Sequence, residues 1–402
     1  FFSCVIMAAQ YSREDVAQHD KYDDAWIVID EGVYNISDWA YKHPGGRVIL
    51  YYRGQDATEP VKAFHPDMEK TNKYMKPYRI GTLTPESHKD IPAVIADFRI
   101  LRKELEEEGA FKPRVSFYMA YLLQIIALEI LAALTLHYTG SLLLTALLLA
   151  TSQIQAGWQQ HDFGHCAVFK SAKLNQMMHY FFIGVCKGAL SWWWKSRHNR
   201  HHAKTNMIKL DPDMHVEPMF SFSEELVSKK KWKPWRRFVP VLPYQKFYWF
   251  LFGPPTVTTF LFMWENTVFM AKRGIAIDII AVYLFFVRFD FVYAPMLPPF
   301  QVLGLYFLMR FIESHWFTWV TSMNHLPMPK KEDSRDDWVT LQLQGTQNVA
   351  NGLFSDWFTG FLNYQIEHHL FPNMPRHHYP EVAGRVKALC AKHNIPYHST
   401  SL

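Results

Sequence analysis

Histidines at helical spacing are the most chemically informative residues of this 402-residue chain. They form three clusters beside apolar segments: His161-Asp-Phe-Gly-His165, His198-Asn-Arg-His201-His202 and Gln365-Ile-Glu-His368-His369. Residues three or four apart lie on one face of a helix, so each cluster can direct two or three imidazoles at a common point. With 20 histidines in the chain, about one His-x-x-x-His pair is expected by chance. The joint occurrence of the clusters therefore predicts a metal site.

Seven imidazoles are too many for a single ion. Tetrahedral zinc takes four ligands, whereas two metal ions that share water or oxygen would use about seven or eight nitrogens. His325, in Ser-Met-Asn-His at the end of the last apolar segment, is the candidate for the eighth. Ligating imidazoles donate their second N–H to a carboxylate or carbonyl, so Asp162, Asp356 and Glu367 are candidates to orient them. Imidazole suits zinc, copper, iron and nickel alike, so the spacing does not choose the metal.

A further pair of histidines lies near the start of the chain. Tyr41-Lys-His43-Pro-Gly-Gly46 places His43 before a Pro-Gly-Gly turn, and His65 follows in Ala63-Phe-His-Pro. Two neutral imidazoles on opposite faces of a porphyrin would make an electron-carrying haem with no open site. A haem that passes single electrons to the histidine clusters favours a redox-active metal there, hence iron.

The segments that must position these histidines fall into two modules. Residues 7–85 carry a net charge of −2 and residues 86–402 a net charge of +7, which indicates different partners for the two parts. Residues 26–36 are predicted to form two strands around a Glu31-Gly32 turn. Between residues 97 and 112, apolar residues at helical spacing predict a linker helix with one buried face: Phe98, Leu101 and Leu105.

Beyond the linker the chain becomes apolar. Residues 118–138 contain one charge and residues 141–158 none, so each approaches the roughly 20 apolar residues that span a bilayer. We predict four membrane spans and two re-entrant or interfacial segments from these and the later apolar segments, 178–194, 247–270, 275–293 and 298–322. Basic residues cluster in the connecting loops, at 195–204, 229–237 and 330–335, which predicts a cytosolic position for these loops and the histidines beside them.

Composition excludes several other classes of protein. With 49% hydrophobic and 20% charged residues, the chain is neither disordered nor collagen-like. Four cysteines without a Cys-x-x-Cys pair exclude a disulfide framework and indicate a reducing compartment. No nucleic-acid partner is expected. Residues 1–6, which precede Met7, are interpreted as a non-native leader.

The quoted residues resemble two known families. Residues 7–85, with His43-Pro-Gly-Gly46 and His65, look like a cytochrome b5 domain, and residues from about 116 to 402 resemble the membrane fatty acyl desaturase domain. The fusion, together with Gln365 in place of the first histidine of the third cluster, is the pattern of front-end desaturases. The resemblance implies an α+β haem domain, a linker over residues 86–115, and an α-helical multi-pass membrane domain with a di-iron site. Because family members continue further, the C-terminus is predicted to be truncated.

The resemblance also implies roles for individual residues. His43 and His65 would ligate haem b, and Gln365 would occupy a ligand position, binding weakly or through water. Two non-haem iron ions would be held by the cluster histidines, with His325 as an additional ligand: His161, His165, His198, His201, His202, His368 and His369.

The chemistry that the resemblance implies is insertion of a double bond between an existing one and the carboxyl end of a polyunsaturated acyl chain. It would use O2 and two electrons from NADH, passed on by cytochrome b5 reductase, at the endoplasmic reticulum membrane. We expect a C18 to C20 polyunsaturated acyl-CoA and Δ6 or Δ5 desaturation, with Δ6 ahead. The alternatives are a sphingolipid Δ8 desaturase, a cytochrome b5-fused lipid hydroxylase and, without catalysis, a membrane-tethered electron carrier.

Four further predictions concern positions around the clusters. The acidic stretches Asp23-Asp24, Asp30-Glu31 and Glu59 are expected to dock on the basic loops by complementary charge. His377-His378 is expected to be a surface turn, and Trp192-Trp193-Trp194 an interfacial aromatic belt rather than a substrate cage. Arg310 and Glu313 are expected to pair or to line the acyl path.

Overall fold

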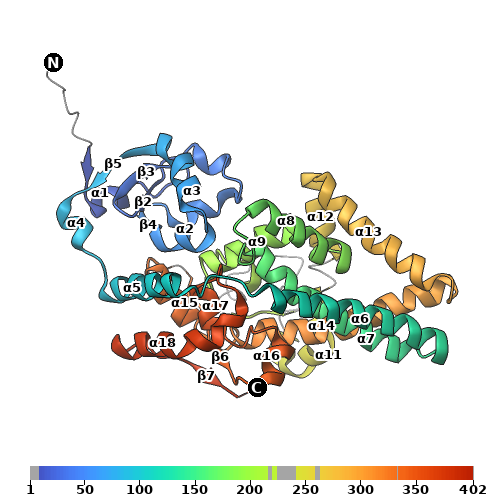
Figure 1. The fold of residues 1–402 in the computed structure, drawn as a ribbon. Coiled ribbons are helices and arrows are strands. Elements are labelled where there is room, and N and C mark those ends of the chain that lie inside the picture. The colour runs from blue at the N-terminus through green and yellow to red at the C-terminus, as the bar shows by residue number, and fades with distance from the viewer. Residues whose placement is uncertain (1–8, 216–219, 224–240, 259–262, 333, 402) are drawn as a thin grey trace.

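The chain folds into a small sheet domain and a larger helical domain, which lie against each other (Figure 1). The computed structural model describes residues 9–215, 220–223, 241–258, 263–332 and 334–401. The predicted leader, 1–6, and the predicted basic loop at 229–237 lie outside these residues. The sheet domain occupies one end of the molecule, and the longest helices extend away from it.

The sheet domain is built on five short strands in the order β1-β5-β3-β2-β4. Their bounds in that order are Gln10–Tyr11, Arg79–Leu83, Gly32–Asn35, Trp26–Ile29 and Gln55–Asp56. Strands β2 and β3 pair antiparallel, with Asp30 in the turn at a φ of 55°. Aspartate is one of the few residues that tolerate this left-handed backbone. The two strands predicted for residues 26–36 are therefore confirmed.

Short helices complete this domain and frame the two histidines. They are α1 (Arg13–Gln18), η1 (Trp39–Tyr41), η2 (Gly46–Tyr52), α2 (Thr58–Phe64), α3 (Met68–Met75), η3 (Lys76–Tyr78) and α4 (Pro85–Lys89). His43 lies between η1 and η2, and His65 is the C-cap residue of α2. The helix ends beside both histidines thus set the direction of their imidazoles.

The linker helix α5 (Ala93–Glu108) joins the two domains. Its predicted apolar face is confirmed, because Phe98, Leu101 and Leu105 are buried. The helix ends earlier than predicted because Gly109 adopts a left-handed conformation, with a φ of 86°, that terminates it. The α5 side chain of Arg99 pairs with Glu59 of α2 at 2.6 Å and ties the linker to the sheet domain.

The helical domain is centred on α7 (Leu142–Gly164), which packs against α6 (Val115–Thr139) and α14 (Pro299–Met323). The remaining elements are α8 (Ala172–His179), the π-helix η4 (Tyr180–Cys186), α9 (Ser191–Ala203), η5 (Pro212–Met214), α11 (Gln245–Thr258), α12 (Asn266–Arg273), α13 (Ala276–Tyr293), α15 (Trp338–Gly345), β6 (Asn348–Val349), α16 (Leu353–Thr359), α17 (Gln365–Leu370), η8 (Arg376–His378), α18 (Tyr379–Lys392) and β7 (Ser399–Thr400).

One of the four predicted membrane spans is supported by the length and hydropathy of a described helix, and the number of spans stays a prediction. Among the described helices, α6 alone is both long and apolar enough to cross a membrane. The second half of α7 is polar and buried, α13 carries three charges, and α14 carries Arg310 and Glu313. The apolar segments at 178–194 and 247–270 are each divided between shorter helices.

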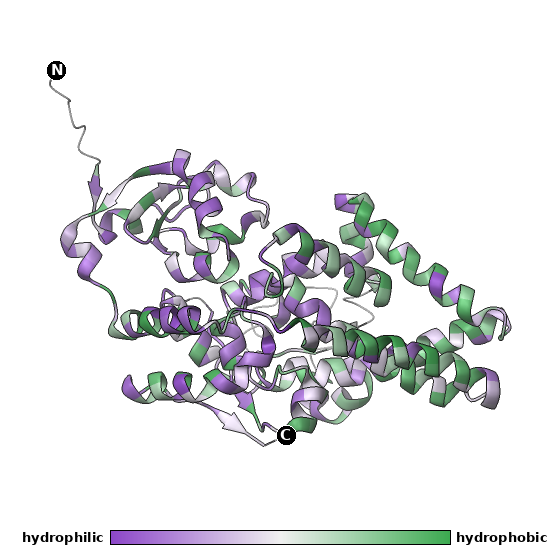
Figure 2. Cartoon of the chain, viewed as in Figure 1, coloured by the Kyte–Doolittle hydropathy of each residue, from purple (hydrophilic) through white to green (hydrophobic). Residues whose placement is uncertain are grey.

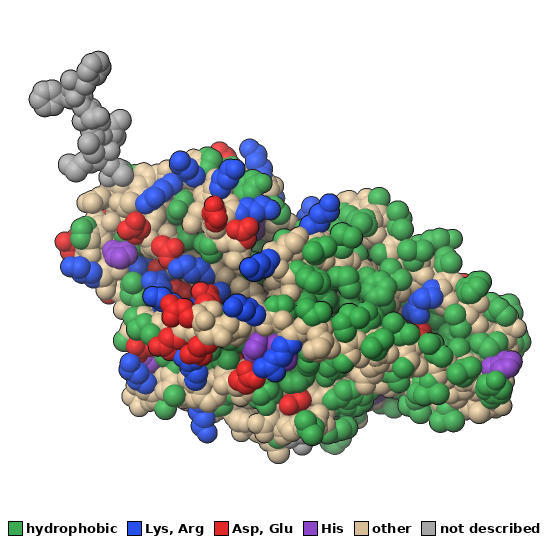
Figure 3. All heavy atoms as spheres, viewed as in Figure 1, with side chains coloured by type: hydrophobic (Ala, Val, Ile, Leu, Met, Phe, Trp, Pro, Cys, Tyr) green, Lys and Arg blue, Asp and Glu red, His purple; other side chains and the backbone are tan. Residues whose placement is uncertain are grey.

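Apolar side chains nevertheless cover the outer faces of these helices. Green, apolar residues dominate α6, α7 and α13 in Figure 2, and they form a broad continuous surface over the end of the molecule away from the sheet domain in Figure 3. Exposed members of this surface include Leu123, Ile130, Tyr283, Phe291, Phe300 and Leu303. A patch of this size marks contact with lipid or with another protein.

Charged residues inside the helical domain are paired. Arg310 and Glu313 contact each other at 2.7 Å, as predicted, and Lys187 also binds Glu313. Arg288 of α13 pairs with Glu129 of α6 at 2.6 Å. Each pair satisfies a charge that would be costly to leave alone in an apolar surrounding.

The prediction of a surface turn at His377-His378 is wrong, because both side chains are buried. His377 Nε2 accepts a hydrogen bond from the backbone N–H of Arg114 at 2.9 Å, and His378 Nε2 donates to the carbonyl of Lys112 at 3.0 Å. These imidazoles fix the chain where the linker enters α6. Bare His-His spacing could not reveal this role, since the partners are backbone groups more than 260 residues away.

Among the described residues, which leave out the basic loop at 229–237, the predicted acidic stretches form their ion pairs within the sheet domain or with the linker. Asp24 binds His19 and Asp30 binds Lys62, both within the sheet domain, while Glu59 binds the linker. The contacts between the domains are instead mostly neutral: the Tyr52 hydroxyl donates to the carbonyl of Ala203, and the Tyr51 hydroxyl to that of Leu210. A surface ion pair between Asp20 and Arg335 adds to them.

Candidate metal centre

Five of the predicted histidines converge on one point. His161 at the end of α7 and His165, its C-cap residue, face His198 and His202 of α9 and His368 of α17, and one nitrogen from each ring lies within 4.8 Å of the others. Nε2 of His198 is 3.1 Å from Nε2 of His161 and 3.0 Å from Nε2 of His202. A neutral imidazole has a single N–H, so lone pairs gathered this closely are the ligand set of a cation.

Three further histidines form a second point of convergence beside the first. Nitrogens of His201, His325 and His369 also lie within 4.8 Å of one another, although three separate segments supply them. The rings of His202 and His369 stack at 4.1 Å, so the two groups share a wall. The structure thus brings together all eight histidines, divided five and three.

Burial and protonation of these rings fit bound metal. Within the described part of the chain, the buried atoms His165 Nε2, His202 Nδ1 and His369 Nε2 have no hydrogen-bond partner. Burial, and secondarily the neighbouring imidazoles, hold the pKa values of His202 and His368 well below the usual range, and burial lowers the pKa of His325 to about 3. These three rings are therefore neutral, the form that ligates metal ions.

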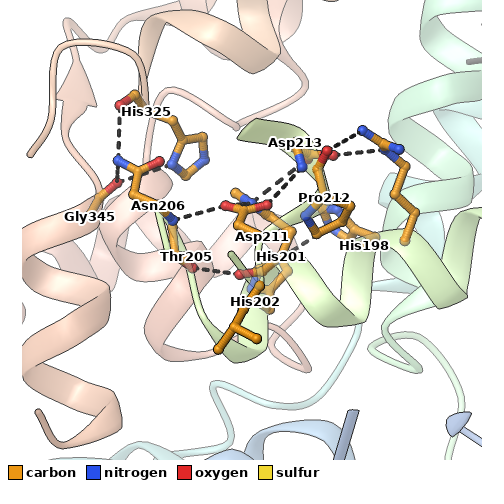
Figure 4. A network of polar contacts seen from close by, with 12 residues as sticks. His198, His201, His202, Thr205, Asn206, Asp211, Pro212, Asp213, His325 and Gly345 are labelled. Atoms are coloured by element: carbon orange, nitrogen blue, oxygen red, sulfur yellow. Dashed lines mark hydrogen bonds and ion pairs between the residues drawn. The ribbon is translucent and has the colours of Figure 1, made fainter. Parts of the chain in front are cut away.

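Asp211 is the principal residue that the sequence analysis missed. Its carboxylate accepts the Nδ1 proton of His201 at 2.9 Å, the backbone N–H of Asn206 at 2.9 Å and that of Asp213 at 2.9 Å (Figure 4). The carboxylate raises the pKa of His201, against the opposing effect of burial. The sequence did offer a signal for Asp211, since it is an acidic residue in the loop that directly follows the second cluster.

Other imidazoles are oriented by neutral groups. The side-chain oxygen of Gln342 accepts a proton from His369 Nδ1 at 2.8 Å, and the carbonyl of Gly345 accepts one from His325 Nδ1 at 3.1 Å. The hydroxyl of Tyr379 lies 3.2 Å from His368 Nδ1. In His368 and His369 the engagement of Nδ1 leaves Nε2 to face the centre of the histidine groups, whereas Nε2 of His325 accepts from Gln365.

The carboxylates proposed from the sequence behave differently. Asp162 lies 3.8 Å from His161 Nδ1, beyond hydrogen-bond distance, and accepts the Tyr118 hydroxyl at 2.6 Å. Glu367 and Asp356 point elsewhere. Glu367 accepts from Asn348 at 2.7 Å and from Tyr397 at 2.9 Å, and Asp356 accepts from Asn363 at 2.9 Å. For Asp162 and Glu367, adjacency in sequence misled the prediction, because side chains next to a ligand on a helix point away from it.

Gln365 lies at the edge of the three-histidine group. Its amide nitrogen donates to His325 Nε2 at 2.8 Å, and its amide oxygen is buried without a hydrogen-bond partner among the described residues. Gln365 therefore contacts the three-histidine group directly, and its role toward a metal ion stays a prediction.

His43 and His65 face each other in the sheet domain, as two haem ligands would. Their ring centroids are 6.0 Å apart, and each Nδ1 donates to a backbone carbonyl, of Gly46 at 3.0 Å and of Val61 at 2.9 Å. Burial lowers the pKa of both imidazoles, so both are neutral. Two neutral rings with Nδ1 engaged present Nε2 to an iron between them.

A partly enclosed cavity of about 150 Å³ borders the two histidine groups. Its walls include His161, His198 and His325 and the charged side chains Arg197, Asp211 and Asp213. Aromatic and aliphatic side chains also line it: Trp158, Trp193, Trp194, Trp249, Phe222, Phe317, Met214 and Leu362. Trp193 and Trp194 are buried, and Trp194 stacks on His198 at 4.3 Å. The prediction of an interfacial belt is therefore wrong for these two residues, which form part of the cavity wall.

Comparison with known proteins identifies the helical domain. The fatty acid desaturase family matches residues 139–401, which is more than half of the chain. The chain belongs to the fatty acid desaturase family. Residues 12–84 of this desaturase match the cytochrome b5-like heme/steroid binding domain. A relative from Mus musculus, the fatty acid desaturase 2-like protein FADS2B, is 40% identical over 398 residues, which cover 96% of this chain and 81% of the relative. This desaturase is therefore an oxidoreductase with a haem-binding domain of the cytochrome b5 type fused to its N-terminal side.

Proposed function

We propose that this desaturase inserts a cis double bond into C18 to C20 polyunsaturated acyl-CoA, between an existing double bond and the carboxyl end. The observation that carries the proposal is the pair of histidine groups at the wall of a mainly apolar cavity. Aromatic side chains in the cavity wall support an acyl chain as the substrate, and an acyl carbon held there would lie beside the histidine groups. The mouse relative is a fatty acid desaturase 2-like protein, which supports a fatty acyl chain as the substrate. Of the two positions, we put Δ6 slightly ahead of Δ5 on the pattern of the third cluster, Gln365-Ile-Glu-His-His369.

The eight histidines would hold two iron ions, and Asp211, Gln342 and Tyr379 would fix the orientation of their rings. When bound, the iron pair supplies the O2-dependent removal of two hydrogens from the acyl chain. The overall reaction balances when two electrons and two protons are added, since O2 then leaves as two waters. NADH would provide the electrons through cytochrome b5 reductase and the fused haem domain.

Membrane attachment at the endoplasmic reticulum is part of the proposal. Helix α6 meets the length and hydropathy of a span, and the exposed apolar surface in Figure 3 continues over α13 and α14. The sheet domain, whose surface is rich in charge in the same view, would face the cytosol with the histidine groups beneath it.

Expression in yeast fed with linoleic, α-linolenic, eicosatrienoic and eicosatetraenoic acids tests the proposal. Gas chromatography should reveal a new Δ6 or Δ5 product from at least one of these acids. A product that has gained oxygen instead of losing two hydrogens would indicate a hydroxylase, and a modified long-chain base would indicate a sphingolipid Δ8 desaturase. A protein that contains haem iron alone would be an electron carrier, whereas the desaturase should contain about three irons per chain, one in the haem and two in the histidine groups.

A further inference from the structure

The sheet domain contacts the metal-bearing helix α9 at its C-terminal end. The Tyr52 hydroxyl donates to the carbonyl of Ala203, and the ammonium of Lys204 lies 4.5 Å from the centre of the Tyr52 ring and 3.4 Å from the side-chain oxygen of Gln55. Ala203 and Lys204 directly follow His202, a member of the five-histidine group. The domain that would hold haem is thus anchored on the residues next to a metal-facing histidine.

One aromatic side chain connects the two candidate redox sites at this contact. Phe64 is the last residue of α2 and precedes His65 in the chain. Its ring meets the ring of His202 edge to face, with centroids 6.5 Å apart and planes at 86°. His202 in turn stacks on His369, so its imidazole lies between the two histidine groups.

We propose that Phe64 couples the haem ligand His65 to His202 for electron transfer within one chain. The path runs through the peptide bond between residues 64 and 65 and then through the contact between the rings of Phe64 and His202. It ends where the two histidine groups meet. The inference rests on the proposed delivery of electrons from the haem domain to the iron pair, and it adds the residue through which delivery occurs.

The step transfers one electron and no atoms. The haem iron goes from ferrous to ferric as one iron ion held by the histidine groups goes from ferric to ferrous. No proton moves between the sites, and two such events supply the two electrons needed for each double bond. Cytochrome b5 reductase, or an external one-electron donor in an experiment, restores the ferrous haem.

Flash reduction of the full chain, loaded with haem and iron, tests the role of Phe64 without acyl substrate or O2. A photoreduced flavin donates one electron to the haem under argon, and the decay of ferrous-haem absorbance then reports transfer to the iron pair. In the unaltered chain we expect a decay rate that does not depend on protein concentration. Chelator-treated protein, which has lost the acceptor, should keep the ferrous-haem signal.

Variants at position 64 test whether the Phe64 ring carries electron transfer or only packs in the interface. Phe64→Leu and Phe64→Met should slow the decay by about tenfold or more, equivalent to about 1.4 kcal/mol of barrier, with unchanged haem spectrum, haem potential and iron content. Phe64→Trp, which restores an aromatic ring, should recover most of the rate. The matched control is Tyr51→Phe, which removes a hydrogen bond to Leu210 in the same interface and should leave the rate unchanged.

A non-aromatic variant that retains haem and iron and transfers electrons at the unaltered rate would overturn the inference. A decay that depends on protein concentration in the unaltered chain would overturn it as well, since transfer would then occur between molecules. Because the measurement uses no acyl chain, a failure to desaturate any of the fed acids would refute the proposed substrate and leave this result standing.

Discussion

His201 donates its Nδ1 proton to Asp211 at 2.9 Å, and the same carboxylate holds the turn that follows the second cluster. We predict that Asp211→Asn, which keeps the shape of the side chain, lowers the affinity of the three-histidine group for iron by about 10- to 100-fold, the usual cost of losing a partner behind a ligating imidazole. Iron retained during titration with a chelator, measured by elemental analysis, checks this. Asp356→Asn is the control, because Asp356 binds Asn363 and not an imidazole; equal iron loss in both variants would contradict the role of Asp211.

Loss of a haem ligand should separate the two metal functions. We predict that His43→Ala removes haem binding and abolishes desaturation, because electrons no longer reach the histidine groups, while the two non-haem irons remain. Haem absorbance, iron content and product formation in cells that lack a separate cytochrome b5 are the measurements. His88→Ala, in α4, should leave all three unchanged. Desaturation by the His43 variant under these conditions would show that electrons enter by another route.

Replacement of the buried Arg376 should strongly lower the stability of the protein. It is buried, lies 3.7 Å from Asp162, and donates to the carbonyl of Trp158 and to Gln159. Arg376→Met should destabilise the protein by about 3 to 5 kcal/mol, because it leaves the carboxylate of Asp162 buried without its countercharge. Thermal unfolding followed by tryptophan fluorescence measures the effect.

The matched control for Arg376 is Arg385→Met, which breaks ion pairs with Glu104 and Glu108 at the surface. We expect a loss of about 1 kcal/mol or less, as for other exposed pairs. Addition of Asp162→Asn to the Arg376 variant should recover part of the lost stability. If the double variant is as unstable as the sum of the two single variants, the two side chains are not energetically coupled.

The last described residues support the third cluster. Tyr397 donates to Glu367 at 2.9 Å and lies 2.7 Å from Asn348, whose side-chain oxygen accepts the N–H of Ile366. Tyr397→Phe should therefore lower stability by about 1 to 3 kcal/mol and reduce iron content. The buried carboxylate of Glu367 would lose one of its two hydrogen bonds and keep only the one from Asn348. Unfolding temperature and iron content check this against His398→Ala, whose exposed side chain should be dispensable. Unchanged values for Tyr397→Phe would show that α17 does not need this contact.

The sequence predicted the parts of the site that depend on spacing. Imidazoles at intervals of three or four residues must share a helix face, so the clusters could be found without a structure, and His325 followed from counting ligands. The helix over α5 and the hairpin over β2 and β3 followed in the same way, from periodicity and a turn.

What the sequence could not predict depends on contacts between distant segments. Asp211, Gln342 and Tyr379 act on imidazoles of other elements or across a loop, and no fixed spacing marks them. The burial of His377 and the division of the eight histidines into five and three follow from how α7, α9 and α17 pack. The number of membrane spans stays a prediction, because among the described helices α6 alone meets the length and hydropathy of a span.

With the sheet domain anchored on Ala203 and Lys204, each molecule would carry its own electron donor. A partner held on the same chain meets its acceptor at a local concentration that dilution of the enzyme does not change. The rate of double-bond formation per molecule should then not depend on the concentration of the enzyme. It should also not depend on competition from other oxidoreductases for diffusing electron carriers. A cell could keep few copies of such an enzyme and still run each of them at full rate.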